Sequence, residues 1–167
     1  FTTMLAANFL LVSCSKDDDQ DEPLSNEFSY NGSNYDLTHG GLNYYGSEGE
    51  ASYLYSMLLF SSHITYNPAE FNFGSGDGEI ISFTLYSSSD NELADGVYDI
   101  TQSEESNTAG LGSFLINYDY VNETSDDEGI MISGTIEVEK TGTSYNIIFD
   151  CKSTNGKTIR GNYEGTL

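Results

Sequence analysis

Positive charge is the scarcest property of this chain. Five lysine and arginine residues stand against 27 aspartate and glutamate residues, which gives a formal net charge of -22 at pH 7 over 167 residues. A field of that sign repels phosphate groups and anionic lipid headgroups. The composition therefore excludes nucleic acid as a partner and excludes membrane binding through a basic surface.

Several other features that mark particular fold classes are also missing. Tryptophan is absent, and proline and cysteine number two each. No segment repeats apolar residues with the helical period of 3.6 over more than two turns. The apolar run near the N-terminus is shorter than the ~20 residues of a membrane-spanning helix. These absences argue against a helical bundle, a transmembrane helix and a disulfide scaffold.

What the sequence does contain is alternation of apolar and polar residues with a period of two, which predicts half-buried strands. The alternation is clearest between residues 130 and 151. The side chains predicted to face inward there are Ile130, Ile132, Ile136 and Val138, followed by Tyr145, Ile147, Phe149 and Cys151.

Turn signals separate these segments. Asn31-Gly32 and Asn155-Gly156 are typical of tight hairpins. Residues 53–60 are apolar on both faces, which favours a central strand, although a single amphipathic helix fits the same residues.

The predicted fold is all-β, an antiparallel meander of about nine or ten strands. Sequential hairpins give antiparallel pairing, and such a meander closes either as a flattened, calycin-like barrel or as a β-sandwich. Alternation by itself does not distinguish these two closures, so both stay open.

The N-terminal residues carry a different kind of information. The apolar run ends in Leu11-Val12-Ser13-Cys14 and is followed at once by polar, acidic residues. This run resembles the lipobox of bacterial lipoproteins, in which the peptidase cuts before a cysteine that is then acylated. The resemblance implies that Cys14 is the lipid attachment site and the tether to a membrane. Because the usual basic segment and an initial Met are missing, we expect the chain to be truncated at its start.

The residues after Cys14 refine the expected location. Lys16, Asp17, Asp18 and Asp19 begin an acidic stretch that resembles the export signal of surface-exposed lipoproteins of the Bacteroidota. The implied location is the outer membrane, with the protein lipid-anchored at the cell surface.

The rest of the chain resembles the small all-β surface lipoproteins of the Bacteroidota. The similarity is carried by residues 93–98, 133–138, 145–150 and 156–165. These segments build hairpins, so the resemblance implies fold and compartment and transfers no functional residue. We predict a signal peptide over residues 1–13, a lipidated acidic linker over 14–26 and a single antiparallel β domain over 27–167.

Candidate sites are few. Two acidic loops contain oxygen ligands of the kind that calcium prefers, although neither has EF-hand spacing; their carboxylates are Asp77, Glu79, Asp126, Asp127 and Glu128. Tyr44 and Tyr45 are the candidate ligand-binding aromatics, since tyrosine suits both sugar faces and barrel cavities. His39, His63 and Cys151 match no catalytic or zinc-binding pattern. No cofactor is expected.

These observations predict a membrane-tethered protein without catalytic activity that binds a ligand, with a glycan as one candidate. A structural or accessory subunit of an outer-membrane complex is the alternative, and a hydrolase is the third possibility. An exposed aromatic patch favours the first, a large flat apolar face the second, and clustered buried carboxylates with raised pKa the third.

Replacing Cys14 with alanine is expected to release the protein from membranes, because stable anchoring depends on acyl chains at that residue. Cell fractionation with immunodetection measures the effect, and Cys151→Ala serves as the control that stays with the membrane. Continued membrane fractionation of Cys14→Ala would contradict the anchor.

Overall fold

The structure, a computed structural model, describes residues 25–49, 51–101 and 103–167. The described part is all-β and contains thirteen strands. Their bounds are β1 Glu27–Tyr30, β2 Ser33–Asp36, β3 His39–Ser47, β4 Tyr53–Phe60, β5 Thr65–Asn67, β6 Asn72–Ser75, β7 Asp77–Ser87, β8 Gly96–Ile100, β9 Thr108–Ala109, β10 Gly112–Asp119, β11 Asp127–Thr141, β12 Ser144–Ser153 and β13 Thr158–Gly165.

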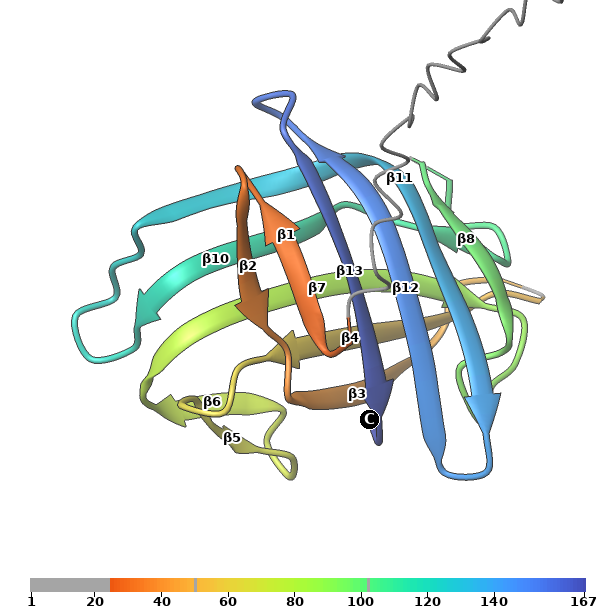
Figure 1. Cartoon of the computed structure of the whole chain (residues 1–167). Coiled ribbons are helices and arrows are strands. Elements are labelled where there is room, and N and C mark those ends of the chain that lie inside the picture. The colour runs from red at the N-terminus through yellow and green to blue at the C-terminus, as the bar shows by residue number, and fades with distance from the viewer. Residues whose placement is uncertain (1–24, 50, 102) are drawn as a thin grey trace, which may run out of the picture.

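Eleven strands form one sheet that folds over into two layers (Figure 1). One layer has the order β3-β4-β7-β10, and the other has the order β2-β1-β13-β12-β11-β8. Between them the strands β7, β10, β11, β8 and β9 pair in a closed ring. The predicted all-β class is confirmed, and the two predicted closures coexist as a small barrel with sheets extending from it.

Pairing is antiparallel throughout the described strands except between β8 and β9, which run parallel. The sequence prediction of a purely antiparallel meander missed this short pair. β9 has only two residues, Thr108 and Ala109, so it leaves too little alternation to be recognised.

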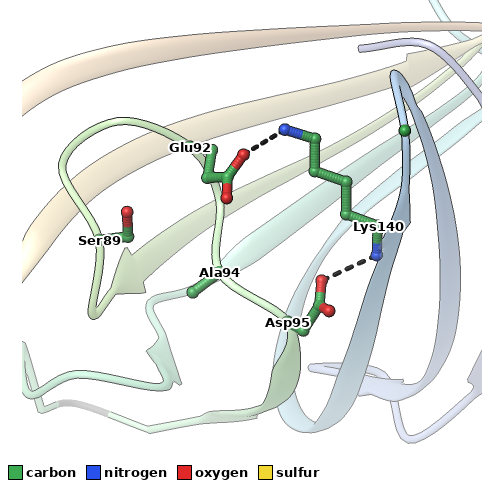
Figure 2. Close-up of a pocket in the computed structure, with 6 residues that line it drawn as sticks. Ser89, Glu92, Ala94, Asp95 and Lys140 are labelled. Carbon is green, nitrogen blue, oxygen red and sulfur yellow. Dashed lines mark hydrogen bonds and ion pairs between the residues drawn. The ribbon is translucent and has the colours of Figure 1, made fainter.

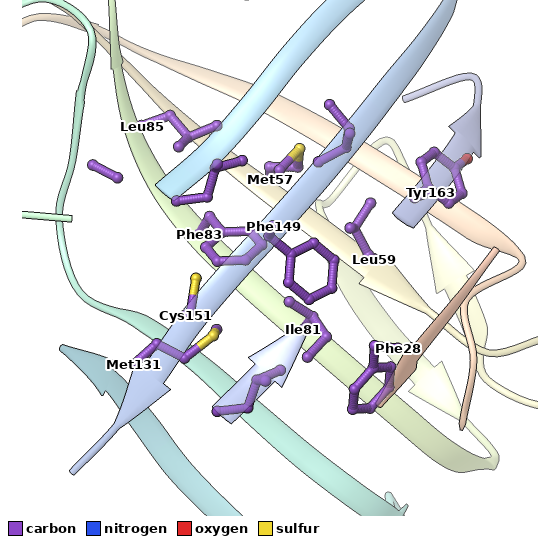
Figure 3. Close-up of a cluster of buried hydrophobic side chains, with 14 of the residues drawn as sticks. Phe28, Met57, Leu59, Ile81, Phe83, Leu85, Met131, Phe149, Cys151 and Tyr163 are labelled. Carbon is purple, nitrogen blue, oxygen red and sulfur yellow. The ribbon is translucent and has the colours of Figure 1, made fainter. Parts of the chain in front are cut away.

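The core lies between the two layers and is aromatic and aliphatic (Figure 3). Phe83 of β7 meets Phe149 of β12 edge to face, with ring centroids 5.4 Å apart, a favourable geometry for aromatic pairs. Phe28, Leu59 and Ile81 pack around this pair and are fully buried. The predicted inward face of β12, with Tyr145, Ile147, Phe149 and Cys151, is therefore confirmed.

The inward face of β11 differs from the prediction. Met131 lies opposite Ser153 and Ser133 opposite Lys152, so Ile132 is an extra residue in β11. Such a bulge reverses the side to which later residues point. Met131 and Ile136 are fully buried, whereas Ile130 and Ile132 are 45% and 47% exposed. The prediction that Ile130 and Ile132 face inward was wrong because alternation was assumed to continue through the bulge.

Residues 53–60 form strand β4, so the helical alternative is wrong there. β4 pairs with β3 on one side and β7 on the other. This central position explains its two apolar faces, because Met57 and Leu59 enter the main core while Leu58 and Phe60 pack on the outside against a second cluster.

The predicted Asn-Gly turns are both present. Asn31 and Gly32 have φ values of 52° and 82°, as a tight hairpin between β1 and β2 requires. At the β12–β13 turn only Gly156 has a positive φ, and its N–H donates to the Ser153 carbonyl. That hairpin therefore has a longer, bulged turn instead of a two-residue one.

Gly134 allows β11 to bend at its bulge. Its φ is 121°, and a Cβ built there would collide with the backbone of Asp150 on β12. Gly134→Ala is expected to lower the free energy of unfolding by about 2 kcal/mol or more, since backbone strain and a rigid clash combine.

Gly156→Ala is the matched control, because Gly156 has a φ of 78° but open space around its Cβ position. Strain alone should cost that variant about 1 kcal/mol. Urea unfolding measures both variants, and equal losses would contradict the role assigned to the bulge.

A candidate binding face on one layer

The outer surface of the layer β3-β4-β7-β10 contains no charged side chain in its open part. Alternation sends Ile81, Phe83 and Leu85 of β7 into the core, so Ser82, Thr84 and Tyr86 point outward. We call this open part the uncharged face. Its residues are Asn43, Tyr45, Leu54, Ser56, Leu58, Ser82, Thr84, Tyr86, Ser113 and Ile130.

The outer surface of the opposite layer is the contrast. It carries a series of outward carboxylates at Glu27, Asp36, Asp99, Glu137, Glu139, Asp150 and Glu164. A chain with a net charge of -22 thus has carboxylates across one layer, whereas the acids of the other layer, Asp77, Glu79 and Asp119, lie at strand ends outside the uncharged face. The uncharged face can accept a ligand without desolvating a charge.

Tyr45 is the most exposed aromatic side chain of the uncharged face, at 60%. Tyr44 lies opposite Tyr55 and Gly46 lies opposite Leu54, so Tyr45 is an extra residue in β3. The bulge separates the two tyrosines that the sequence put forward together. Tyr44 is on the inner side, with its ring 5.2 Å from that of Tyr55, whereas Tyr45 projects from the uncharged face.

The β5–β6 hairpin covers the adjoining part of the same outer surface. Tyr66 and Phe73 of the hairpin pack on Phe60, with ring centroids 5.0 Å and 5.3 Å away. The Tyr66 hydroxyl lies over Gly41, where any Cβ would collide with it. Burial raises the pKa of Tyr66, and the nearby phenol of Tyr45 adds to this effect. Tyr45 and Tyr66 are therefore neighbours at the edge of the uncharged face.

Tyr86 occupies the end of the uncharged face nearest to acidic residues. Burial is the main cause that raises its pKa, and the carboxylates of Glu104 and Glu48 raise it further. Its hydroxyl therefore stays protonated at neutral pH and is able both to donate and to accept a hydrogen bond.

Hydroxyl groups lie between the aromatic positions. Ser82 and Ser113 are within hydrogen-bonding distance through their Oγ atoms, 2.7 Å apart. Ser56 and Thr84 lie opposite each other on β4 and β7. Alternation in β7 was visible in the sequence, but which strands would bring their hydroxyls and tyrosines together was not.

Two cavities lie away from this face. The smaller is lined by Glu92, Asp95 and Lys140, which contact one another (Figure 2). Lys140 forms an ion pair with Glu92, and the Lys140 backbone N–H donates to the Asp95 carboxylate at 2.8 Å. The loop between β7 and β8 is fastened further by Tyr98, whose buried hydroxyl donates to the Ala94 carbonyl at 2.7 Å. Within residues 93–98, Asp95 and Tyr98 therefore hold the loop between β7 and β8 in place.

The predicted calcium loops place their carboxylates against protein partners. Asp126 accepts from the Asn117 amide at 2.8 Å, and Asp127 accepts from the Tyr30 hydroxyl at 2.8 Å. That hydrogen bond is the largest cause that lowers the pKa of Asp127. Glu128 accepts from the Ser125 hydroxyl at 3.1 Å.

The other acidic loop contributes Asp77, which lies opposite Asp119 at the β7–β10 ladder, and Glu79, which is half-buried. Across residues 25–49, 51–101 and 103–167, no three His, Cys, Asp or Glu side chains gather in a group that could hold a metal ion.

The histidines and Cys151 lie in structural surroundings. The His39 ring stacks on Phe60, with centroids 5.6 Å apart, and His63 is exposed in the turn after β4. Cys151 is fully buried in the core, where burial is the main cause that raises its pKa to about 12.

The predicted lipidation site Cys14 and the predicted export residues Lys16, Asp17, Asp18 and Asp19 lie outside the residues that the structure describes. Within the described residues there is no helix with the length and apolar character to cross a membrane. Comparison of the chain with protein-family models, with curated proteins and with solved structures finds no match.

The Cys151 thiol is expected to resist labelling in the native protein. The thiolate is the reactive species, and with a pKa of about 12 it makes up about one part in ten thousand near pH 8. A thiol reagent applied to Cys14→Ala, with and without denaturant, isolates Cys151. Fast labelling in the folded protein would contradict its burial.

Proposed function

We propose that this protein is a non-catalytic binding module that holds a neutral glycan chain on the uncharged face. The observation that carries the proposal is the absence of charge from this face in a chain that has 27 acidic residues. A charged ligand would find no counter-charge there, whereas a neutral polyhydroxylated ligand would find both of the groups it needs.

The first group is aromatic surface. A tyrosine ring has an apolar body and a polar tip, and it loses little conformational freedom on binding. The exposed ring of Tyr45, with Tyr66 beside it and Tyr86 towards the other end, suits the apolar C–H face of sugar rings.

The second group is a set of neutral donors and acceptors. The hydroxyls of Ser56, Ser82, Thr84 and Ser113 and the amide of Asn43 can exchange hydrogen bonds with sugar hydroxyls. They lie on paired strands of a sheet, so their spacing is fixed before a ligand arrives and little ordering entropy is lost.

The same proposal includes the location. An acylated Cys14, followed by the export-type residues Lys16, Asp17, Asp18 and Asp19, would hold the β domain at the outer surface of an outer membrane, where extracellular glycans are available. The support is the resemblance of these residues to a lipobox and an export signal.

The alternative of an accessory subunit draws on different residues. Leu54, Leu58 and the 45% exposed Ile130 add apolar area to the uncharged face, which suits a protein partner. The hydrolase alternative has less support, because the buried polar side chains of the described chain are serines and include no carboxylate.

Tyr45→Ala and Tyr86→Ala are each expected to lower the affinity for a neutral glycan by about tenfold or more, equivalent to ~1.4 kcal/mol. Tyr45→Phe should retain most of the affinity because it keeps the ring. A glycan array identifies the ligand, and calorimetry with the selected oligosaccharide measures the change.

Tyr120→Ala is the matched control, since Tyr120 is 38% exposed and lies after β10, outside the uncharged face. Undiminished binding by Tyr45→Ala and Tyr86→Ala would contradict the assignment of the ligand to the uncharged face. A blank array would contradict the glycan ligand, and a pull-down from outer membranes would then test the protein-partner alternative.

A further inference from the structure

The larger cavity lies at the end of the other layer, where the β1–β2 turn meets the start of β13 (Figure 1). Its volume is about 510 Å³, within the range of small-ligand sites. We call it the β1–β13 cavity, and its lining residues are Ser29, Tyr30, Asn31, Gly32, Asn34, Lys157, Thr158 and Arg160.

Charge distinguishes this cavity from the rest of the surface. The lining residues include Lys157 and Arg160 and no acidic residue, although the whole chain carries -22. Each cation is paired with a carboxylate outside the lining, Lys157 with Asp127 and Arg160 with Asp150. Lys157 and Arg160 are two of the four cationic side chains in the described residues. Polar groups of Asn31, Asn34 and Thr158 complete the lining.

Lys157 pairs with Asp127 and lies over the ring of Tyr30, which also lines the cavity. Its Nζ is 3.6 Å from the nearer Asp127 oxygen, longer than the ~2.8 Å of a charge-assisted hydrogen bond. That same oxygen already accepts the Tyr30 hydroxyl at 2.8 Å. Nζ also lies 4.9 Å from the centroid of the Tyr30 ring, which positions the ammonium group at the cavity wall.

Arg160 is anchored from the neighbouring strand. Its Nε and Nη2 both donate to one oxygen of Asp150, at 3.1 Å and 2.8 Å, and its side chain remains 52% exposed. Asp150 therefore orients the guanidinium group without removing it from solvent. An exposed ion pair of this kind contributes little to stability. The stability of the fold therefore does not account for an arginine at the edge of this cavity.

We propose that the β1–β13 cavity binds an oxyanion carried by a hydroxylated ligand, such as the carboxylate of an acidic sugar. Lys157 and Arg160 take the oxyanion, and Ser29, Asn31, Asn34 and Thr158 take the hydroxyl groups. This site is separate from the uncharged face in position and in ligand charge, and it does not depend on the glycan binding proposed there.

Titration of the full-length protein with glucuronate, glucose and inorganic sulfate at constant ionic strength tests the proposal. Glucuronate is expected to bind and glucose is not. Lys157→Gln and Arg160→Gln should each weaken glucuronate binding by about tenfold. Lys152→Gln is the matched control, because it removes the same charge from an exposed lysine outside the lining and should change affinity less than about twofold.

Each outcome decides between distinct possibilities. Sulfate binding as tightly as glucuronate, with the same two variants affected, would retain the oxyanion site and assign it to free oxyanions. Absence of binding by both anions, or equal losses in all three variants, would overturn the proposal, since equal losses reflect only overall charge. NMR shifts confined to residues 29–34 and 157–160 provide a readout that needs no variant to fold.

Discussion

The bend in β11 is the constraint on which the rest of the structure depends. Over Asp127 to Met131 the strand pairs with β10 of one layer, and over Thr135 to Val138 it pairs with β8 of the other. A single strand can serve both layers only if it turns between them, and bulged strands are the usual means of doing so. The extra residue Ile132 and the glycine at 134 provide that turn, so the closed ring and the enclosed core both follow from it.

Electrostatics then decides how the outside of the two layers can be used. Folding brings the acids of the described residues onto a small surface, and their mutual repulsion is lower when they are spread over the turns and one layer. The uncharged face of the other layer is built from tyrosines, hydroxyls and a few aliphatic side chains. Acidic surface keeps the protein soluble, while the uncharged face avoids the desolvation cost that charged groups would impose on ligand binding.

The two proposed sites differ because their positions in the fold differ. The uncharged face is a row of side chains across paired strands, so it suits an extended neutral chain. The β1–β13 cavity is formed where two turns meet and is lined by Lys157 and Arg160, so it suits one anionic group.

The sequence by itself determined the all-β class, most strand positions and the turns at Asn31-Gly32 and Asn155-Gly156, because alternation and turn chemistry are local properties. Only the tertiary structure decided which side of β11 is buried and which of Tyr44 and Tyr45 lies on the uncharged face, since each depends on a bulge set by the partner strand. The pairing of β1 with β13, which joins residues about 130 positions apart, also lies beyond any local pattern. Both candidate sites are assembled from such distant strands, and that is why the sequence put forward Tyr45 for the uncharged face but neither its neighbours there nor any residue of the β1–β13 cavity.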